Sequence, residues 1–248
     1  MKPRPPPRVL SRLVSLKMRM FVAGAAGAIG RQLVPMLLGA GHHVTGTTRD
    51  GSRAEWLRSI GAEPVVLDAL DADAVRRALV AAHPVVVVHQ LTDLAAGFAP
   101  EQLRATSRLR EIGTRNLVDG MRVAGANRLV AQSGAWLYTD GPLPHTERDP
   151  MGGDGPEDAV LRGISELERL TLTTQHIDGL VLRYGMLYGP GTAYADASAV
   201  APPRVHVTAA ARAAMFASER GSPGAYNIVD DDPAVSNERA RQELGWRP

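Results

Sequence analysis

The chain has 248 residues, of which 44% are hydrophobic and 22% charged, and its formal net charge at pH 7 is +2. This composition is ordinary for a globular protein, and the length is sufficient for one domain with a full core and a small additional lobe. The sequence has no cysteine, which excludes disulfides and thiolate metal sites, and no apolar run of the roughly 18–20 residues that a membrane span needs.

The first 20 residues carry an excess of basic charge. They contain six lysines and arginines and no acid, so the remainder of the chain carries a net charge of −4. Prolines at positions 3 and 5–7 disfavour an ordered start. We interpret residues 1–17 as a disordered basic extension. A basic arm for nucleic acid or membrane, or a transit peptide, is the alternative interpretation of the same pattern.

A glycine-rich turn between a strand and a helix is the strongest motif. Met20–Ala23 is a short apolar run typical of a buried strand, and Gly24, Gly27 and Gly30 follow at three-residue spacing. Arg31–Leu38 then has apolar residues at helical spacing. A helix N-terminus offers free N–H groups and partial positive charge, and glycines let a diphosphate approach the backbone. We therefore predict a dinucleotide site at this turn that also includes Ala28 and Ile29.

The residues after the second predicted strand bear on the choice of cofactor. His43–Thr48 is the strand, and in dinucleotide-binding folds a residue at its end contacts the adenosine ribose. An acid there would accept hydrogen bonds from the 2′-hydroxyl of NAD. The sequence instead has Thr48 and Arg49, and a guanidinium can pair with a 2′-phosphate. We predict NADP(H) in preference to NAD(H), the alternative being a solvated loop arginine.

The chain continues as alternating helices and strands. The predicted elements are helix Ala54–Ile60, strand Pro64–Leu67, helix Val75–Ala82, strand Pro84–Val88, helix Pro100–Ala124 and strand Arg128–Ala131. This alternation predicts an α/β fold, a Rossmann-like doubly wound parallel sheet. Ligands bind at the carboxyl ends of such strands, so Gln90 and Leu91 are candidate cofactor contacts.

Several motifs resemble the extended, epimerase/dehydratase-like branch of the short-chain dehydrogenase/reductase superfamily. They include the G-x-x-G-x-x-G spacing, Ser133 followed by Tyr138 in an S-x-x-x-x-Y pattern, the strand and loop Leu180–Gly191, and the G-W-x-P ending. The resemblance covers nearly all of Met20–Pro248, with contractions in the second half. It implies that Ser133 orients a substrate oxygen and that Tyr138 donates a proton.

The same resemblance assigns further contacts. Asp68, at the end of the third predicted strand, would contact the adenine, although a cap of the next helix explains it as well. Tyr184 lies in the strand segment that resembles the family and would contact the cofactor. Glu147 and Asp149 resemble the acidic bend of the family, and His145 is interpreted as a solvated loop histidine. No residue set has metal-ligand spacing, so we assign no metal.

The usual Tyr-x-x-x-Lys pair of this superfamily is missing from the predicted helix Asp158–Gln175. Alignment on Glu168 places the two slots at Val160 and Ile164, neither of which can titrate. The chain contains only two lysines, Lys2 and Lys17, so no other alignment restores the pair. Arginine does not replace lysine for tuning a tyrosine, because it stays charged.

We expect three regions: the extension 1–17, a Rossmann-like domain 18–183 and a reduced substrate lobe 184–248. The favoured function is NADP(H)-dependent hydride transfer to or from a carbonyl or secondary alcohol of a sugar-like substrate. The alternative is a non-catalytic NADP(H)-binding sensor or scaffold. We expect a small-molecule substrate, no nucleic acid or membrane partner, and a cytoplasmic location. A homodimer is left open as the assembly.

Overall fold

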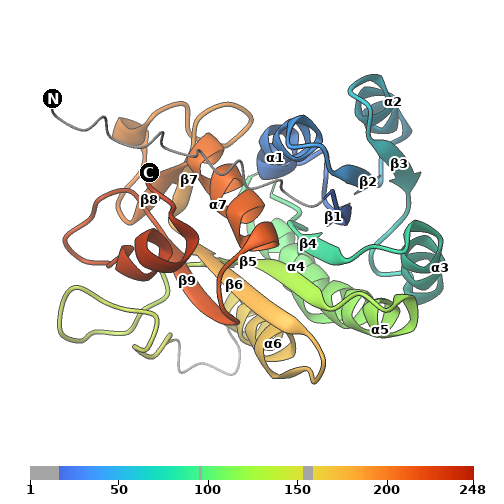
Figure 1. The fold of residues 1–248 in the computed structure, drawn as a ribbon. Helices are drawn as coiled ribbons and strands as arrows, with labels where there is room; N and C mark the ends of the chain where they lie inside the picture. The colour runs from blue at the N-terminus through green and yellow to red at the C-terminus, as the bar shows by residue number, and fades with distance from the viewer. Residues whose placement is uncertain (1–16, 95–96, 153–158) are drawn as a thin grey trace, which may run out of the picture.

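The computed structural model describes residues 17–94, 97–152 and 159–248, so most of the predicted extension 1–17 lies outside the described residues. Seven strands form one parallel sheet in the order β3-β2-β1-β4-β5-β6-β9 (Figure 1). The strands are β1 (Arg19–Ala23), β2 (His43–Thr48), β3 (Glu63–Val66), β4 (Val86–His89), β5 (Arg128–Gly134), β6 (Asp178–Tyr184) and β9 (Gly224–Ile228). The Rossmann-like doubly wound architecture is confirmed.

Helices cover both faces of the sheet (Figure 1). They are α1 (Ala28–Gly39), α2 (Gly51–Ser59), α3 (Ala72–Ala82), α4 (Pro100–Arg108), α5 (Thr114–Ala124), α6 (Ala159–Thr173) and α7 (Val207–Glu219). One apolar core lies where α1 and α7 pack on the sheet, and a second lies under α3 and α5. The strand order reverses between β1 and β4, which leaves a crevice at the carboxyl edge of the sheet.

The long helix predicted over residues 100–124 contains one irregular turn. A single π-helical turn, η1 (Leu109–Gly113), joins α4 to α5 without a break in the helical path. A π turn adds one residue to the helical repeat and is frequently found at functional sites. The periodicity of the sequence predicted the helix but did not indicate this turn.

The segment 184–248, expected as a reduced lobe, contributes to two parts of the structure. A small two-stranded parallel sheet, β7 (Met186–Tyr188) with β8 (Arg204–His206), lies beyond β6, and a short 3-10 turn η2 (Ala197–Ala199) precedes β8. The remainder belongs to the main core, because α7 packs on α1 and β9 pairs with β6.

The C-terminal G-W-x-P ending has a clear structural role. Trp246 follows the π turn η3 (Ala240–Leu244), is fully buried, and donates from its indole nitrogen to the Ala209 carbonyl at 2.8 Å. Burial of a large aromatic side chain with its N–H satisfied anchors the end of the chain on α7. Within the described ranges, no helix combines the length and the apolar character that crossing a membrane requires.

Candidate functional site

Two adjoining cavities open at the carboxyl edge of the sheet. The larger, of about 500 Å³, is lined by residues at or after the carboxyl ends of β1, β2, β4, β5 and β6 and by one residue of the π turn, Arg110. The smaller, of about 90 Å³, lies between the ends of β1 and β2 and the loop after β4. Both cavities share four residues in their walls, namely Gly27, Arg49, Arg53 and Thr92.

The three glycines of the turn are required for different reasons. Gly24 has a φ of +86°, and a Cβ there would lie 2.6 Å from the Gln90 carbonyl oxygen. Gly30 would bring a Cβ within 2.4 Å of the Ala25 carbonyl oxygen. Gly27 has an extended backbone that any residue can adopt, and its Cβ would meet only the Gly24 oxygen at 3.3 Å. The missing side chain of Gly27 therefore leaves space in the two cavities and not in the protein interior.

The start of α1 fits a diphosphate. Gly27 is the N-cap and offers no side-chain acceptor, and the first turn contains no acid, so its backbone N–H groups are left for a ligand. Ala28 lines the larger cavity, whereas Ile29 and Gly30 are buried in the helix. The donors, the helix dipole and the space beside Gly27 together suit the diphosphate of a dinucleotide.

The smaller cavity suits the adenosine end of such a ligand. Thr48, Arg49 and Leu91, which the sequence analysis gives as candidate cofactor contacts, all line it. Arg49 donates to the Asp93 carboxylate at 2.6 Å, and both side chains are partly exposed. Asp68 is exposed and accepts from the Leu70 backbone N–H at 2.9 Å. The N-cap of α3 is the neighbouring Asp71, so Asp68 does not cap that helix.

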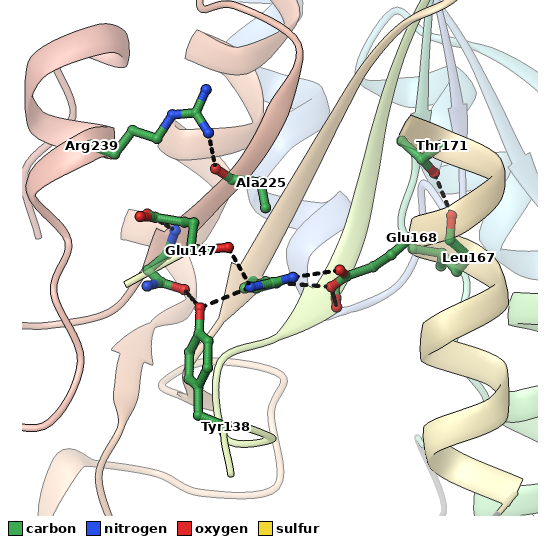
Figure 2. Close-up of polar contacts among 10 residues, drawn as sticks. Tyr138, Glu147, Leu167, Glu168, Thr171, Ala225 and Arg239 are labelled. Carbon is green, nitrogen blue, oxygen red and sulfur yellow. Dashed lines mark hydrogen bonds and ion pairs between the residues drawn. The ribbon is translucent and has the colours of Figure 1, made fainter. Parts of the chain in front are cut away.

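Ser133 lies on the wall of the larger cavity, but its hydroxyl proton is used in a hydrogen bond to a buried carboxylate. The hydroxyl donates to Glu168 Oε1 at 2.6 Å, and both side chains are buried. Arg183 donates to both oxygens of the same carboxylate, from Nε at 3.0 Å and from Nη2 at 2.7 Å. Figure 2 shows Glu168 extending from α6 into this network. A serine hydroxyl has one proton, so Ser133 is left as an acceptor toward the cavity.

Tyr138 lies in the same network and not on the wall of either cavity. Its hydroxyl donates to Asn227 Oδ1 at 2.6 Å and accepts from Arg183 Nη1 at 3.0 Å (Figure 2). Burial raises the pKa of Tyr138, although the Arg183 guanidinium opposes that shift. Glu147 closes the network, because its carboxylate accepts from the Asn227 backbone N–H at 2.7 Å. The structure therefore does not bring Ser133 and Tyr138 together as proton donors to one substrate.

His145 packs against this network and does not line either cavity. Its ring stacks on Tyr138 with centroids 5.1 Å apart, and its Nδ1 is buried without a hydrogen-bond partner. The neighbouring Asp149 accepts from the Thr146 backbone N–H, and this hydrogen bond is the main reason that the pKa of Asp149 is lowered. The predicted acidic bend is thus a structural feature around Tyr138.

Three buried side chains at the carboxyl ends of the strands or in the π turn have polar atoms without hydrogen-bond partners: the Gln90 amide, Nε of Arg110 and the Tyr184 hydroxyl. Arg110 and Tyr184 line the larger cavity, whereas Gln90 lines neither cavity. Gln90 and Tyr184 were predicted as cofactor contacts. The Tyr184 hydroxyl lies beside the Gln90 amide without a hydrogen bond of normal geometry, and burial raises the pKa of Tyr184 well above its ordinary value. Buried polar groups are rarely left unpaired, which makes these side chains candidates for contact with a ligand.

Arg110 is a site residue that the sequence analysis missed. It is 5% exposed, and burial lowers its pKa to about 10. His89 is fully buried nearby, and its pKa is lowered to about 3 by burial and then by the positive charge of Arg110. The periodicity of the helix contained a signal, because Arg110 falls in line with Thr106, Gly113 and Leu117 on the buried face.

Helix α6 offers no titratable group at the two slots identified by alignment. Ile164 is fully buried, and Val160 is partly buried. Lys17, the one lysine in the described ranges, lies against Gly41 at the end of α1 and not at either cavity. Across residues 17–94, 97–152 and 159–248, no three His, Asp or Glu side chains are grouped as metal ligands would be.

Known proteins resemble this chain in sequence and in fold. A model of the NAD(P)H-binding family matches residues 24–213. The 3-diazoavenalumate denitrifying reductase of a Streptomyces species is 42% identical over 240 residues, which cover 88% of this chain and 77% of that protein. The UDP-glucose 4-epimerase of Thermotoga maritima superposes with a TM-score of 0.76 at 19% identity, covering 93% of this chain and 94% of the other. The Bordetella bronchiseptica enzyme WbmH, solved in complex with NAD+, gives a TM-score of 0.72 at 18% identity over 93% and 94%.

Proposed function

The chain belongs to the NAD(P)H-binding family, and we propose that it is an NADP(H)-dependent reductase whose substrate is a diazo compound that loses its nitrogen as N2. One structural observation carries the proposal. The two candidate proton donors, Ser133 and Tyr138, both donate their only proton to buried protein acceptors. The similarity to a denitrifying reductase that acts on a diazo compound supports the same substrate class.

Residues of the glycine turn and the strand ends are proposed to hold the cofactor. The start of α1 beside Gly27 and Ala28 would bind the diphosphate, and Thr48, Arg49 and Leu91 the adenosine end. The unpaired polar groups of Gln90 and Tyr184 would face the nicotinamide end. Asp68 lies between Leu67 and Ala69, which line the smaller cavity, and is retained as a candidate adenine contact.

NADP(H) is proposed as the preferred form because two arginines line the cavity in which the 2′-phosphate would lie. Arg49 and Arg53 are both there, and neither is buried. The ion pair of Arg49 with Asp93 is partly exposed, and such pairs contribute about 0–1 kcal/mol. Charge-assisted hydrogen bonds to a phosphate contribute roughly 1.5–3 kcal/mol. Arg49 therefore gains free energy when it exchanges the Asp93 carboxylate for the 2′-phosphate.

The chemistry of a diazo substrate matches a site without a free proton donor. Reduction of a carbonyl leaves an alkoxide, which needs a positioned acid. An arenediazonium is a cation, so addition of one hydride to its terminal nitrogen gives a neutral aryldiazene. Loss of N2 from the diazene then gives the arene, whose new ring hydrogen comes from the exchangeable diazene N–H or from water. Bound NADPH supplies the hydride, and the balance is ArN2⁺ + NADPH → ArH + N2 + NADP⁺.

Hydride transfer to a carbonyl or from a secondary alcohol is the second candidate function. Ser133 favours it, because this residue lies at the carboxyl end of β5 on the cavity wall, where a substrate oxygen would be bound. The hydroxyl can accept a hydrogen bond from a substrate alcohol but has no proton for a carbonyl oxygen. The observed direction of the hydrogen bond thus supports the first candidate over the second.

The test uses the full chain with NADPH and 4-carboxybenzenediazonium. We expect NADPH oxidation, N2 release and benzoate formation in equimolar amounts. Because NADPH also reduces diazonium ions slowly in solution, the Gly27→Val variant serves as the background control. Faster oxidation with aldehydes or ketones than with the diazonium would favour the second candidate. Cofactor binding without any turnover would favour the non-catalytic sensor or scaffold.

A further inference from the structure

Arg110 carries a positive charge on the wall of the larger cavity without a partner. The residue is 5% exposed, and its Nε is buried without a hydrogen bond. Within the described part of the chain, no carboxylate contributes to the pKa of Arg110, and the shift in that pKa has burial as its cause. Burying an unpaired charge is costly, so folding gains nothing from this arginine.

The π turn explains how an arginine comes to lie there. Arg110 is the second residue of η1, which interrupts the α-helical repeat between α4 and α5. Its backbone carbonyl accepts from the Thr114 hydroxyl at 2.5 Å, which fixes the turn on the buried side of the helix. Arg108, two residues earlier, is exposed, so the helix presents one arginine to solvent and the next to the cavity. Irregular helical turns of this kind commonly position a functional side chain.

The rest of the cavity wall suggests the shape of the ligand. Phe98, Trp136 and Tyr194 line the same cavity, and the rings of Phe98 and Tyr194 stack with centroids 6.3 Å apart. Trp136 is 40% exposed and Phe98 42%, although large apolar side chains are usually buried. The buried Arg110 guanidinium together with these aromatic faces suits a flat molecule that ends in a carboxylate.

We propose that Arg110 is the substrate-carboxylate receptor and that the substrate is an aromatic carboxylic acid whose ring lies against Phe98, Trp136 and Tyr194. This inference rests on the proposed function, because it takes the larger cavity as the substrate site. The guanidinium would bind the carboxylate through two parallel N–H···O bonds. Arg110 would thus determine which carboxylic acids bind. It would also hold the reacting end of the substrate near the cofactor.

A phosphate of the cofactor is the other candidate anion for Arg110, and the geometry favours the substrate. The diphosphate already has donors at the start of α1, and a 2′-phosphate has Arg49 and Arg53. Arg110 lines the larger cavity together with Ser133, and it does not line the smaller, adenosine-side cavity.

The test measures binding to the full chain saturated with NADP⁺, by calorimetry, with cinnamate and cinnamamide as probes. We expect the wild type to bind cinnamate about 10–100-fold more tightly than cinnamamide, the range of a charge-assisted hydrogen-bonded pair. Arg110→Met should abolish this preference, Arg110→Lys should restore part of it, and the matched variant Arg108→Met should keep it. The affinity of Arg110→Met for NADP⁺ should equal that of the wild type.

Thermal unfolding separates this role from a structural one. Arg110→Met removes an unpaired buried charge, so its melting temperature should equal or exceed that of the wild type. A clear loss of stability with an unchanged preference for cinnamate would overturn the proposal, as would a loss of NADP⁺ affinity, which would assign Arg110 to the cofactor. Absence of cinnamate binding to the wild type would also overturn it. Absence of diazonium reduction with intact, Arg110-dependent cinnamate binding would instead contradict the proposed function alone.

Discussion

Replacement of Gly27 by valine tests whether the glycine turn is a cofactor site. Gly27 has a φ of −77° and a ψ of −179°, which valine adopts without strain, and its Cβ would contact only the Gly24 oxygen, at 3.3 Å. A smaller unfolded-state entropy stabilises the variant by about 0.4–1 kcal/mol, and loss of a favourable N-cap residue costs about as much. We therefore expect the free energy of unfolding to change by no more than about 1 kcal/mol.

The effect on cofactor binding should be much larger. The isopropyl group of Gly27→Val would project into the two cavities and hold the diphosphate away from the N–H groups at the start of α1. Each charge-assisted hydrogen bond contributes about 1.5–3 kcal/mol, so the loss of two costs roughly 3–6 kcal/mol. This corresponds to an increase in the NADPH dissociation constant of about 10²–10⁴-fold.

Calorimetric titration with NADPH measures this effect, and circular dichroism measures the stability of the same sample. Gly39→Val is the matched control, because Gly39 lies at the other end of α1 and a Cβ there meets nothing within 4 Å. The control should bind NADPH as the wild type does. If Gly27→Val binds NADPH within about threefold of the wild type, a difference below 1 kcal/mol, the turn is structural and the cofactor assignment fails.

Three further predictions concern single side chains. Arg49→Ala should weaken NADPH binding about 10–100-fold and leave NADH binding unchanged in titrations; equal losses would contradict a 2′-phosphate contact. Glu168→Ala should lower the free energy of unfolding in urea by about 3–5 kcal/mol because it leaves Arg183 buried without its carboxylate, whereas the double variant with Arg183→Met should lose less. His89 stays neutral in the fold with a pKa of about 3, while the unfolded state takes up a proton below about pH 6.5. The stability it contributes should thus be present above pH 6.5 and decline toward pH 3, and a His89→Asn variant should show a shallower decline.

Local signals in the sequence were sufficient for the strands up to β5 and for the glycine turn. The strand–glycine–helix order of residues 20–38 and the alternation that follows it each depend on neighbours close in the chain, and both appear in the structure. The sequence identified the G-W-x-P ending as a motif. Its structural role is the contact of Trp246 with Ala209 on α7, which no local pattern predicts. The position of β9 beside β6 is also a long-range feature.

The buried arginine was missed although its position contained a signal. Helical spacing from Thr106 to Leu117 places Arg110 on the apolar face, where an arginine is rare unless it is paired. An unbroken helix does not predict a ligand contact for Arg110. The residue types also do not indicate the π turn. A charged residue in an apolar stripe is therefore a usable signal for a ligand site, provided that no acid lies at helical spacing beside it.

The roles of Ser133 and Tyr138 depended on hydrogen-bond direction, which a motif does not specify. The S-x-x-x-x-Y pattern places a serine at a strand end and a tyrosine nearby, as in the resembling family, but the acceptors of their protons are Glu168 and Asn227, which lie 35 and 89 residues farther along the chain. Each acceptor is itself held, Glu168 by both ends of the Arg183 guanidinium and Asn227 by the Ser236 carbonyl. Releasing either proton to a substrate would break a buried network, at a cost comparable to leaving a buried polar group unpaired. A hydride acceptor that is already a cation avoids that cost. This difference is the physical reason why the proposed substrate is a diazo compound and not a carbonyl.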